Sequence, residues 1–285
     1  MDERQPERPQ LRRTLGLLAL ALAVPLVVVM VNASLQRQLI YYPDTSPAGS
    51  AAAALPGAED VVLTTEDGLE LDAWLMPPDT TDRGVAVLVA PGNAGNRAGR
   101  APLASALAAQ GFTVLLLDYR GYGGNPGSPS EQGLAMDARA AATFLSQRGF
   151  ARGCTIYYGE SLGTGVVARL TTTHPPAGVV LRSPYPRFAA VAKVHYPWLP
   201  VELILVDRFP ARDNLSASDV PVVVLAGSAD DIIPSRLSEE LAEGVGNLHA
   251  KVIVANAGHN DPIWHGPFLA EQVANLADEV ARSCR

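Results

Sequence analysis

A serine that could act as a nucleophile lies near the middle of this 285-residue chain. Ser161 lies in the stretch GESLG, which ends a run of β-branched and aromatic residues and places a glycine two positions to either side of the serine. A tight strand-to-helix turn of this kind strains the serine backbone and exposes its hydroxyl, and only glycine fits at the flanking positions. The motif predicts a nucleophilic serine, although so short a pattern also arises by chance in an ordinary turn.

An acid and a base follow in later loops. Asp230 comes after the apolar run 222–227, and His259 comes after the apolar run 251–255. An imidazole takes the proton of an attacking serine hydroxyl, and a carboxylate holds that imidazole in one tautomer. Asp231 directly follows Asp230, and one of the two aspartates could instead cap the start of the next helix. We choose Asp230 as the better candidate for the catalytic acid. The order serine, aspartate, histidine differs from that of the two common serine-protease types.

Backbone donors for a negative oxygen are expected in two places. The loop PGNAGN, residues 91–96, follows the apolar run 85–90 and offers free N–H groups at the start of a helix. We expect the N–H groups of Asn93 and Leu162 to form an oxyanion hole, because the residue after the nucleophile supplies one donor and an earlier loop the other. The predicted chemistry is acyl transfer to Ser161 followed by hydrolysis.

Short apolar runs alternate with helical patterns along the rest of the chain. The segment 60–78 has the alternation of a β-hairpin. The buried-strand runs are 85–90, 113–118, 155–159, 178–182, 222–227 and 251–255, and the helical patterns are 97–110, 130–148, 162–173, 234–244 and 267–283. This order predicts an α/β fold with an eight-stranded, mostly parallel sheet and helices on both faces. Ligands bind at the carboxyl ends of the strands in such a sheet, which is where the candidate residues fall.

The longer motifs resemble those of a known family. The stretch DYRGYGGNPGSPSEQGLAMDARAA (118–141), with PGNAGN before it and GESLGTG after it, closely resembles α/β-hydrolase-domain proteins of the bud-emergence type, which are membrane-anchored serine hydrolases. LIYYP (39–43) is similar to their post-anchor segment. The resemblance implies the α/β-hydrolase fold and catalytic roles for Ser161, Asp230 and His259.

Two features of the resemblance concern the site's surroundings. The family usually has histidine where this chain has Pro91, which bears on the geometry of the oxyanion loop but not on the base. Family members carry the DYRGYG loop beside the oxyanion hole, and we interpret its Asp118 and Arg120 as structural.

The N-terminal region departs from a soluble pattern. Residues 14–35 form an uncharged apolar stretch long enough for a transmembrane helix, and four arginines precede it. We predict a signal anchor at 14–35 with residues 1–13 in the cytoplasm, a linker at 36–58 and the hydrolase domain at 59–285 on the extracytoplasmic side, as a single-pass membrane protein. A cleaved signal peptide is the alternative.

Composition excludes several classes of protein. The net charge of −7 and the absence of a basic stripe argue against a nucleic-acid partner. We expect no cofactor and no metal, because the sequence lacks metal-type Cys/His spacing and nucleotide-binding glycine patterns. Cys154 and Cys284 allow one disulfide bridge at most, and their pairing is left open. The oligomeric state is not predicted.

A short cap is expected at 183–215, between a sheet strand and the strand that leads to Asp230. Its apolar residues either pack on the sheet or face a substrate with an acyl chain. We therefore predict a small-molecule or lipid-like acyl ester or thioester as substrate. A serine peptidase of the same fold and a catalytically silent membrane-tethered binding or scaffold protein are the alternatives.

Overall fold

The computed structural model describes residues 14 and 33–284. Residues 33–40 are helical, and a separate compact unit begins at Tyr41. No helix in the described parts of the chain is both long enough and apolar enough to cross a membrane. The predicted anchor at 14–35 lies, apart from residues 14 and 33–35, outside the described residues. Our prediction of a single-pass membrane protein with an extracytoplasmic catalytic domain is wrong for the residues that the structure describes, since they contain no such helix.

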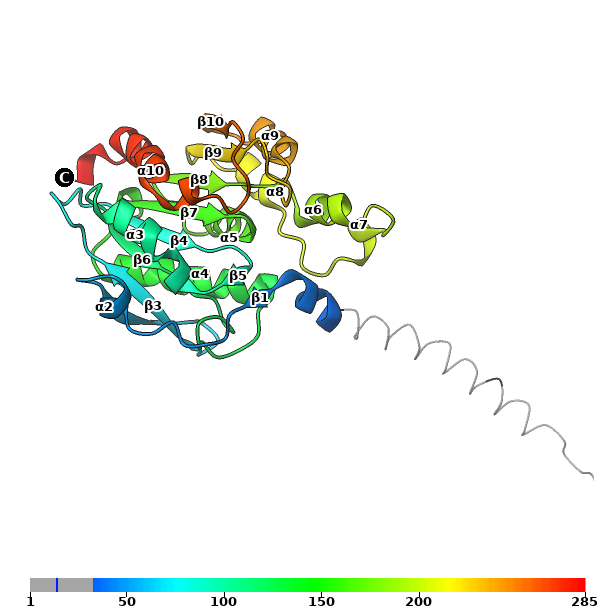
Figure 1. The fold of residues 1–285 in the computed structure, drawn as a ribbon, viewed down its shortest axis with the longest axis horizontal. Coiled ribbons are helices and arrows are strands. Elements are labelled where there is room, and N and C mark those ends of the chain that lie inside the picture. The colour runs from blue at the N-terminus through cyan, green and yellow to red at the C-terminus, as the bar shows by residue number, and fades with distance from the viewer. Residues whose placement is uncertain (1–13, 15–32, 285) are drawn as a thin grey trace, which may run out of the picture. The chain divides into compact units, whose positions relative to one another are not determined.

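An eight-stranded sheet forms the centre of the compact unit (Figure 1). Its strands, in spatial order, are β10 (Leu248–Val254), β9 (Val222–Gly227), β8 (Gly178–Arg182), β7 (Thr155–Glu160), β4 (Ala86–Ala90), β6 (Thr113–Leu116), β3 (Glu70–Met76) and β2 (Glu59–Thr64). The hairpin β2–β3 is antiparallel and joins β6 antiparallel, while the six strands from β6 to β10 run parallel. The predicted α/β fold with an eight-stranded, mostly parallel sheet is confirmed.

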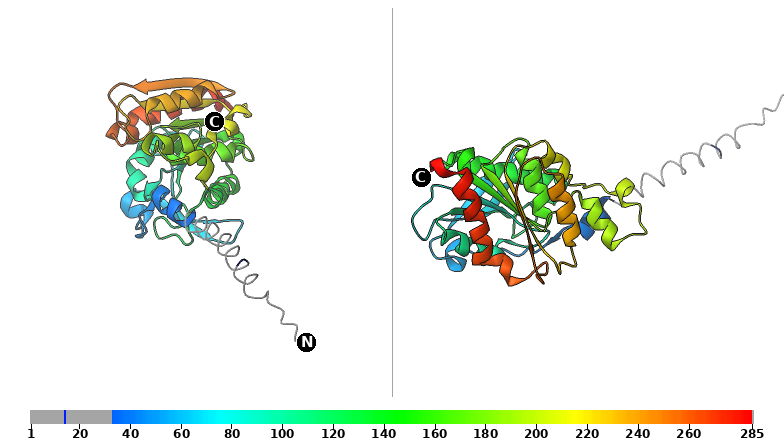
Figure 2. Two further views of the ribbon diagram at one scale, coloured as in Figure 1. Left: turned by 90° about the vertical axis from the view of Figure 1, so that its right-hand side faces the viewer. Right: turned by 90° about the horizontal axis from the view of Figure 1, so that it is seen from above.

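Helices cover both faces of the sheet (Figure 2). The helices α3 (Ala101–Ala108) and α10 (Pro267–Val280) pack together on one face, while α4 (Glu131–Gln147), α5 (Leu162–Thr171) and α8 (Ala211–Ser216) pack together on the other. A further helix, α9 (Ser235–Glu243), packs against β9 and β10. Alternate residues of the central strands face opposite layers, so the strands read as continuous apolar runs that are buried on both sides.

The strand order brings the candidate loops to one edge. Strand β4 lies between β6 and β7, and Ala90 at its end pairs with Gly159 near the end of β7. After β4 the chain continues to β6 on one side of it, and it later returns to form β7 on the other side. The loop that follows β4 and the loop that follows β7 therefore open next to each other. This reversal of strand order is where ligands bind in open parallel sheets.

The stretch 36–58, which we predicted as a linker, contains structured residues. Strand β1 (Tyr42–Pro43) pairs in parallel with β5 (Ala94–Gly95), and a short helix α2 (Ala51–Ala54) follows. The side chain of Leu55 is buried in the main core. The compact unit therefore begins at Tyr41 rather than at residue 59, because this segment packs against the sheet layers.

The predicted cap contains the helices α6 (Phe188–His195) and α7 (Val201–Ile204), which project from the body of the domain in Figure 1. Phe209 is buried and forms an edge-to-face contact with Phe188. In contrast, the side chains of Trp198 and Leu203 are 76% and 82% exposed. Part of the cap thus packs inward, while its α6–α7 end presents apolar side chains to solvent.

A disulfide bond joins Cys154 to Cys284, with the two Cα atoms 5.6 Å apart. Cys154 ends the 3₁₀ turn Arg152–Cys154 before β7, and Cys284 ends the turn Arg282–Cys284 after α10. The bridge therefore lies at the amino end of β7, away from the edge that carries Ser161. It ties the C-terminal helix to the central strand across 130 positions of sequence.

Candidate active site

The turn that carries Ser161 has the backbone of a nucleophile elbow. Ser161 adopts φ 51° and ψ −117°, a left-handed region that non-glycine residues rarely occupy. A Cβ atom at Gly159 would lie 2.7 Å from the carbonyl oxygen of Gly163. A Cβ atom at Gly163 would lie 2.6 Å from the carbonyl oxygen of Pro91 and still closer to that of Ala90. Both glycines are therefore required sterically, because α5 starts in contact with β7 and with the end of β4.

Backbone hydrogen bonds hold this strained turn in place. The N–H of Ser161 donates to the carbonyl of Arg182, at the end of β8, with a distance of 2.9 Å between the two atoms. The carbonyl of Ser161 accepts from the N–H of Thr164 at 3.0 Å and from its hydroxyl at 2.6 Å. Ser161 itself is only 7% exposed. The turn is thus anchored to the neighbouring strand on one side and to the first turn of α5 on the other.

Asp230 and His259 are brought into direct contact. Asp230 follows β9 and His259 follows β10, and these two strands are paired neighbours. The Nδ1 atom of His259 lies 2.7 Å from Oδ2 of Asp230, and both side chains are buried. An imidazole held at Nδ1 by a carboxylate presents its other nitrogen, Nε2, to a substrate or a nucleophile.

The carboxylate of Asp230 is held by several further donors. Its Oδ2 accepts from the hydroxyl of Ser183 at 2.8 Å, and its Oδ1 accepts from the N–H groups of Ile232 and Ile233 at 3.0 and 2.7 Å. Burial raises the pKa of Asp230, but the hydrogen bond from His259 and these donors outweigh burial, so the pKa lies below its ordinary value. The neighbouring Asp231 is exposed. The structure therefore places Asp230, and not Asp231, beside the histidine.

Arg182 joins the serine turn to the histidine loop. Its carbonyl accepts from Ser161, and its Nη1 donates to the carbonyl of His259 at 2.8 Å. Among the hydrogen bonds of the described residues, none joins Oγ of Ser161 to the ring of His259. Such contacts are often long in unliganded enzymes and shorten when substrate binds.

The predicted oxyanion loop lies beside the serine turn. The N–H of Gly92 donates to Oε1 of Glu160 at 2.9 Å. The carbonyl of Asn93 accepts from the N–H of Tyr42 at 2.8 Å and from the hydroxyl of Tyr122 at 2.9 Å. Leu162 is the first residue of α5, so its N–H is one of the helix-start donors that have no acceptor within the helix.

Pro91, where the resemblance noted from the sequence leads us to expect histidine, has a defined place in this loop. Its carbonyl accepts from the hydroxyl of Tyr119 at 3.0 Å. The same carbonyl faces the position where Gly163 lacks a side chain. The DYRGYG segment therefore supports the loop at Pro91 through the hydroxyl of Tyr119.

Asp118 and Arg120 of the DYRGYG segment form buried ion pairs outside the candidate residues. Asp118 pairs with Arg97 at 2.8 Å, and burial raises its pKa to about 6 although Arg97 lowers it. Arg120 pairs with Asp137 at 2.7 Å and with Asp67 at 2.8 Å. These contacts support the interpretation that both residues are structural.

Sequence reasoning missed Glu160, the residue just before the serine. Glu160 is 2% exposed and contacts both Arg100 and Arg182. A charged residue at the end of an otherwise apolar strand was the available signal, because carboxylates are rarely buried without a partner. Arg100 ends the 3₁₀ turn Arg97–Arg100 and Arg182 ends β8, so the pattern of the sequence does not reveal that the two arginines meet at Glu160.

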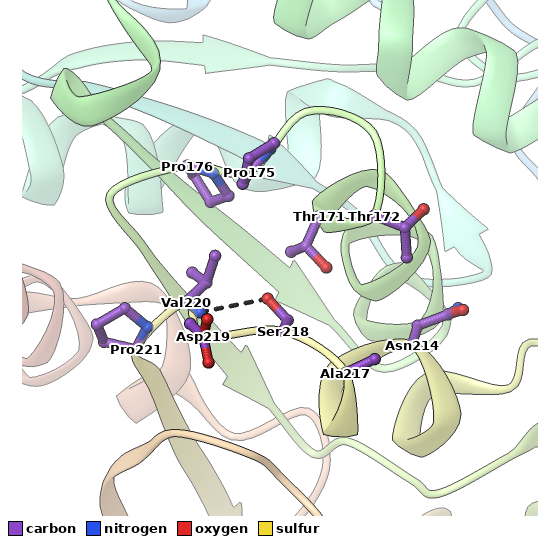
Figure 3. A pocket seen from close by; sticks show the side chains of 10 residues that line it. All are labelled: Thr171, Thr172, Pro175, Pro176, Asn214, Ala217, Ser218, Asp219, Val220 and Pro221. Atoms are coloured by element: carbon purple, nitrogen blue, oxygen red, sulfur yellow. Dashed lines mark hydrogen bonds between the residues drawn. The ribbon is translucent and has the colours of Figure 1, made fainter.

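A hollow of about 600 Å³ lies elsewhere on the domain (Figure 3). Its lining comes from the end of α5 with the loop before β8, and from α8 with the segment between α8 and β9. The lining residues are Thr171, Thr172, Pro175, Pro176, Asn214, Ala217, Ser218, Asp219, Val220 and Pro221. These segments precede their strands, so the hollow lies at the amino ends of the strands. It is therefore separate from the loops that carry Ser161, Asp230 and His259.

Known proteins are similar to this chain in sequence and in fold. The family described as "Serine aminopeptidase, S33" matches residues 83–211. Rv2307c of Mycobacterium tuberculosis (strain ATCC 25618 / H37Rv) is 45% identical over 271 residues, which are 94% of this chain and 96% of that protein. Lysophosphatidylserine lipase ABHD12 of Danio rerio is 28% identical over 278 residues, covering 81% of this chain and 72% of that protein.

A solved structure shares the architecture. The esterase Pf2001 of Pyrococcus furiosus superposes with a TM-score of 0.67 at 19% identity, covering 85% of this chain and 98% of that one. The predicted α/β-hydrolase fold is thereby confirmed, whereas the bud-emergence type stays a prediction. Because the similarity to Rv2307c extends over nearly the whole of both proteins and the S33 match falls within it, the chain belongs to the S33 family of α/β-hydrolases.

Proposed function

We propose that the protein is a serine hydrolase that cleaves an ester, thioester or related acyl bond through an acyl-enzyme on Ser161. The observation that carries the proposal is the buried contact of 2.7 Å between His259 and Asp230. These two residues follow β10 and β9 at the same edge of the sheet where Ser161, held at φ 51°, follows β7. Arg182 links the serine turn to the His259 loop through two hydrogen bonds, which supports a joint role for the three residues. Membership of a hydrolase family supports the same proposal.

Each residue of the triad has one task in this mechanism. His259 takes the proton of Ser161 as the hydroxyl attacks the acyl carbon, and later gives that proton to the leaving group. Asp230 fixes the ring orientation and stabilises the imidazolium. In the second half of the reaction, water attacks the acyl-enzyme with His259 again as the base, and Ser161 is regenerated.

The negative oxygen of the tetrahedral intermediate requires donors that are already in place. We propose the N–H groups of Leu162 and Asn93 for this role. Leu162 supplies a helix-start donor directly after the nucleophile, and Asn93 lies in the loop that opens beside it. The hydrogen bonds to the carbonyl of Asn93 support a fixed loop, which suits a preorganised site.

The proposed substrate has a lipid-like or medium-length acyl chain. The exposed Trp198 and Leu203 of the cap offer apolar surface to such a chain. Nε2 of His195 at the end of α6 lies 2.8 Å from the carbonyl of Ile232, two residues beyond Asp230, so α6 lies against the acid loop. A relative at 28% identity is named a lysophosphatidylserine lipase, which is an activity on a lipid ester.

A peptidase is the second candidate, because the matching family is described as serine aminopeptidases. Esters and amides use the same catalytic groups, so the triad does not separate the two. The discriminating measurement compares hydrolysis of p-nitrophenyl acyl esters with that of aminoacyl p-nitroanilides by the same preparation. Faster cleavage of the anilides than of any ester would replace the esterase proposal by the peptidase.

Labelling with a fluorophosphonate probe tests the proposal against a silent scaffold. The probe reacts only with an activated serine, so the wild type should be labelled and should hydrolyse a p-nitrophenyl ester. Ser161→Ala should lose both properties, whereas Ser183→Ala, whose serine contacts Asp230 instead, should still be labelled. An unlabelled wild type that is folded by circular dichroism would favour the binding protein.

A further inference from the structure

Glu160 occupies the centre of a buried ionic network. Its Oε1 accepts from the N–H of Gly92 at 2.9 Å and from Nε of Arg100 at 3.1 Å, and its Oε2 lies 3.3 Å from Nη2 of Arg182. Burial raises the pKa of Glu160, but the two guanidinium groups and the Gly92 donor outweigh burial, so the pKa lies well below its usual range. The carboxylate therefore stays charged inside the protein.

Arg100 carries the network into the proposed oxyanion loop. Its Nη1 donates to the carbonyl of Ala94 at 3.0 Å and to the carbonyl of Asn96 at 3.3 Å. Together with the bond from Gly92 to Glu160, these contacts hold residues on both sides of Asn93. The position of the loop is thus tied to one carboxylate that belongs to the serine motif.

Arg182 carries the network to the other two catalytic loops. Its carbonyl holds the N–H of Ser161, and its Nη1 holds the carbonyl of His259. One buried charge thereby contacts, directly or through one arginine, the oxyanion loop, the serine turn and the histidine loop.

A buried ionic network of this kind adds little to the free energy of unfolding. Burying charges costs several kcal/mol per ion before pairing, and an apolar replacement of similar shape often stabilises a protein as well or better. What a buried ionic network supplies instead is directed contacts, because each guanidinium donor fixes a particular carbonyl. The contacts here converge on the loops whose relative positions decide whether the reacting groups meet.

We propose that Glu160 is a positioning residue, which sets the oxyanion loop and the His259 loop relative to Ser161 through Arg100 and Arg182. This inference rests on the proposed serine hydrolase function. Its consequence is that loss of the Glu160 charge slows the chemical step in molecules that are still folded, while substrate binding changes little.

The test measures steady-state kinetics of Glu160→Gln on a p-nitrophenyl ester, with the active sites titrated by a fluorophosphonate. We expect kcat per titrated site to fall about 10- to 100-fold and KM to change less than about threefold, because a small misplacement of reacting groups has effects of this size. The matched control is Asp137→Asn, which neutralises another buried carboxylate whose hydrogen bonds go to Arg120. This control should keep the wild-type kcat per titrated site.

A second variant tests the same inference if Glu160→Gln does not fold. Arg100→Lys keeps a cation beside Glu160 but cannot hold Ala94 and Asn96 together, so kcat per titrated site should fall about tenfold. A wild-type kcat per titrated site in the folded variants, with only the titrated fraction reduced, would show a purely structural role and overturn the inference. A wild type that neither labels nor hydrolyses would instead overturn the proposed function, and the inference with it.

Discussion

The ring of His259 lies 2.7 Å from the carboxylate of Asp230, although the two residues reach this contact from different strands. The pair is buried, and the exposed Asp231 takes no part in it. This contact decides which aspartate is the candidate acid, and it gives the first prediction its control.

Loss of any residue of the proposed triad should remove most of the proposed esterase activity without unfolding the protein. Ser161→Ala, His259→Ala and Asp230→Asn should each lower kcat/KM by about 10³-fold or more, because the three residues act as a unit. Asp231→Asn should stay within about threefold of the wild type. The measurement is ester hydrolysis with circular dichroism as the check on folding; a dead Asp231→Asn beside an active Asp230→Asn would reverse the assignment of the acid.

The serine turn should not tolerate a side chain at Gly163. In Gly163→Ala the new Cβ would overlap the carbonyls of Ala90 and Pro91, so the turn must shift and activity should fall about 100-fold or more. Gly153→Ala is the matched control, because no atom lies within 4 Å of its added Cβ. Equal activity of the two variants, measured with the same ester, would contradict the steric account of the elbow.

The disulfide should contribute substantially to stability. Cys154→Ser or Cys284→Ser should lower the free energy of unfolding by about 2–5 kcal/mol, since the bridge closes a long loop of the unfolded chain. Urea unfolding with and without a reducing agent measures this. Reduced wild type and the serine variants should then have the same midpoint, and an oxidised wild type no more stable than the variants would rule out the contribution.

Stability in acid should depend on Glu160. The folded state lowers the pKa of this carboxyl below its ordinary value of 4.5. As the pH falls through that value, the unfolded chain takes up a proton that the folded chain does not, so the free energy of unfolding decreases by about 1.4 kcal/mol per pH unit. Glu160→Gln should lack this part of the slope, as measured by urea unfolding between about pH 5.5 and about pH 3.5.

The exposed Glu243 supplies the control for the acid experiment. Glu243→Gln, at the end of α9, should keep the full wild-type slope. An unchanged slope in Glu160→Gln would mean that this carboxyl is not held ionised in the folded protein.

The cap should favour longer acyl chains. Activity on p-nitrophenyl esters should rise from acetate to octanoate, by up to about fourfold per added methylene where the chain is buried. The double variant Trp198→Ser, Leu203→Ser should flatten this rise, whereas Val62→Ser, an exposed apolar residue on β2, should not. A strict preference for acetate in the wild type would contradict the proposed substrate class.

The sequence by itself determined the elements and the candidate triad. Continuous apolar runs predicted the parallel strands to within a few residues, because strands covered on both faces need no polar positions. The motif GESLG predicted the elbow, since the strained serine and its two flanking glycines stand within five residues of sequence. The carbonyls that exclude a side chain at Gly163 belong to Ala90 and Pro91, which only the folded chain brings there. Chain order and strand ends together selected Asp230 and His259, and the structure places these two residues in contact.

Only the tertiary structure decided which distant residues meet. Arg100 and Glu160 are 60 positions apart, and Arg182 and His259 are 77 apart, so their contacts depend on the order of the strands in the sheet. The pairing of Tyr42 with Ala94 in the proposed oxyanion loop and the bridge between the cysteines depend on the same order. A periodic pattern reports which face of an element is buried, but it carries no information about the partner across the interface. For that reason the contacts of Glu160 with Arg100 and Arg182 could be found only in the folded chain.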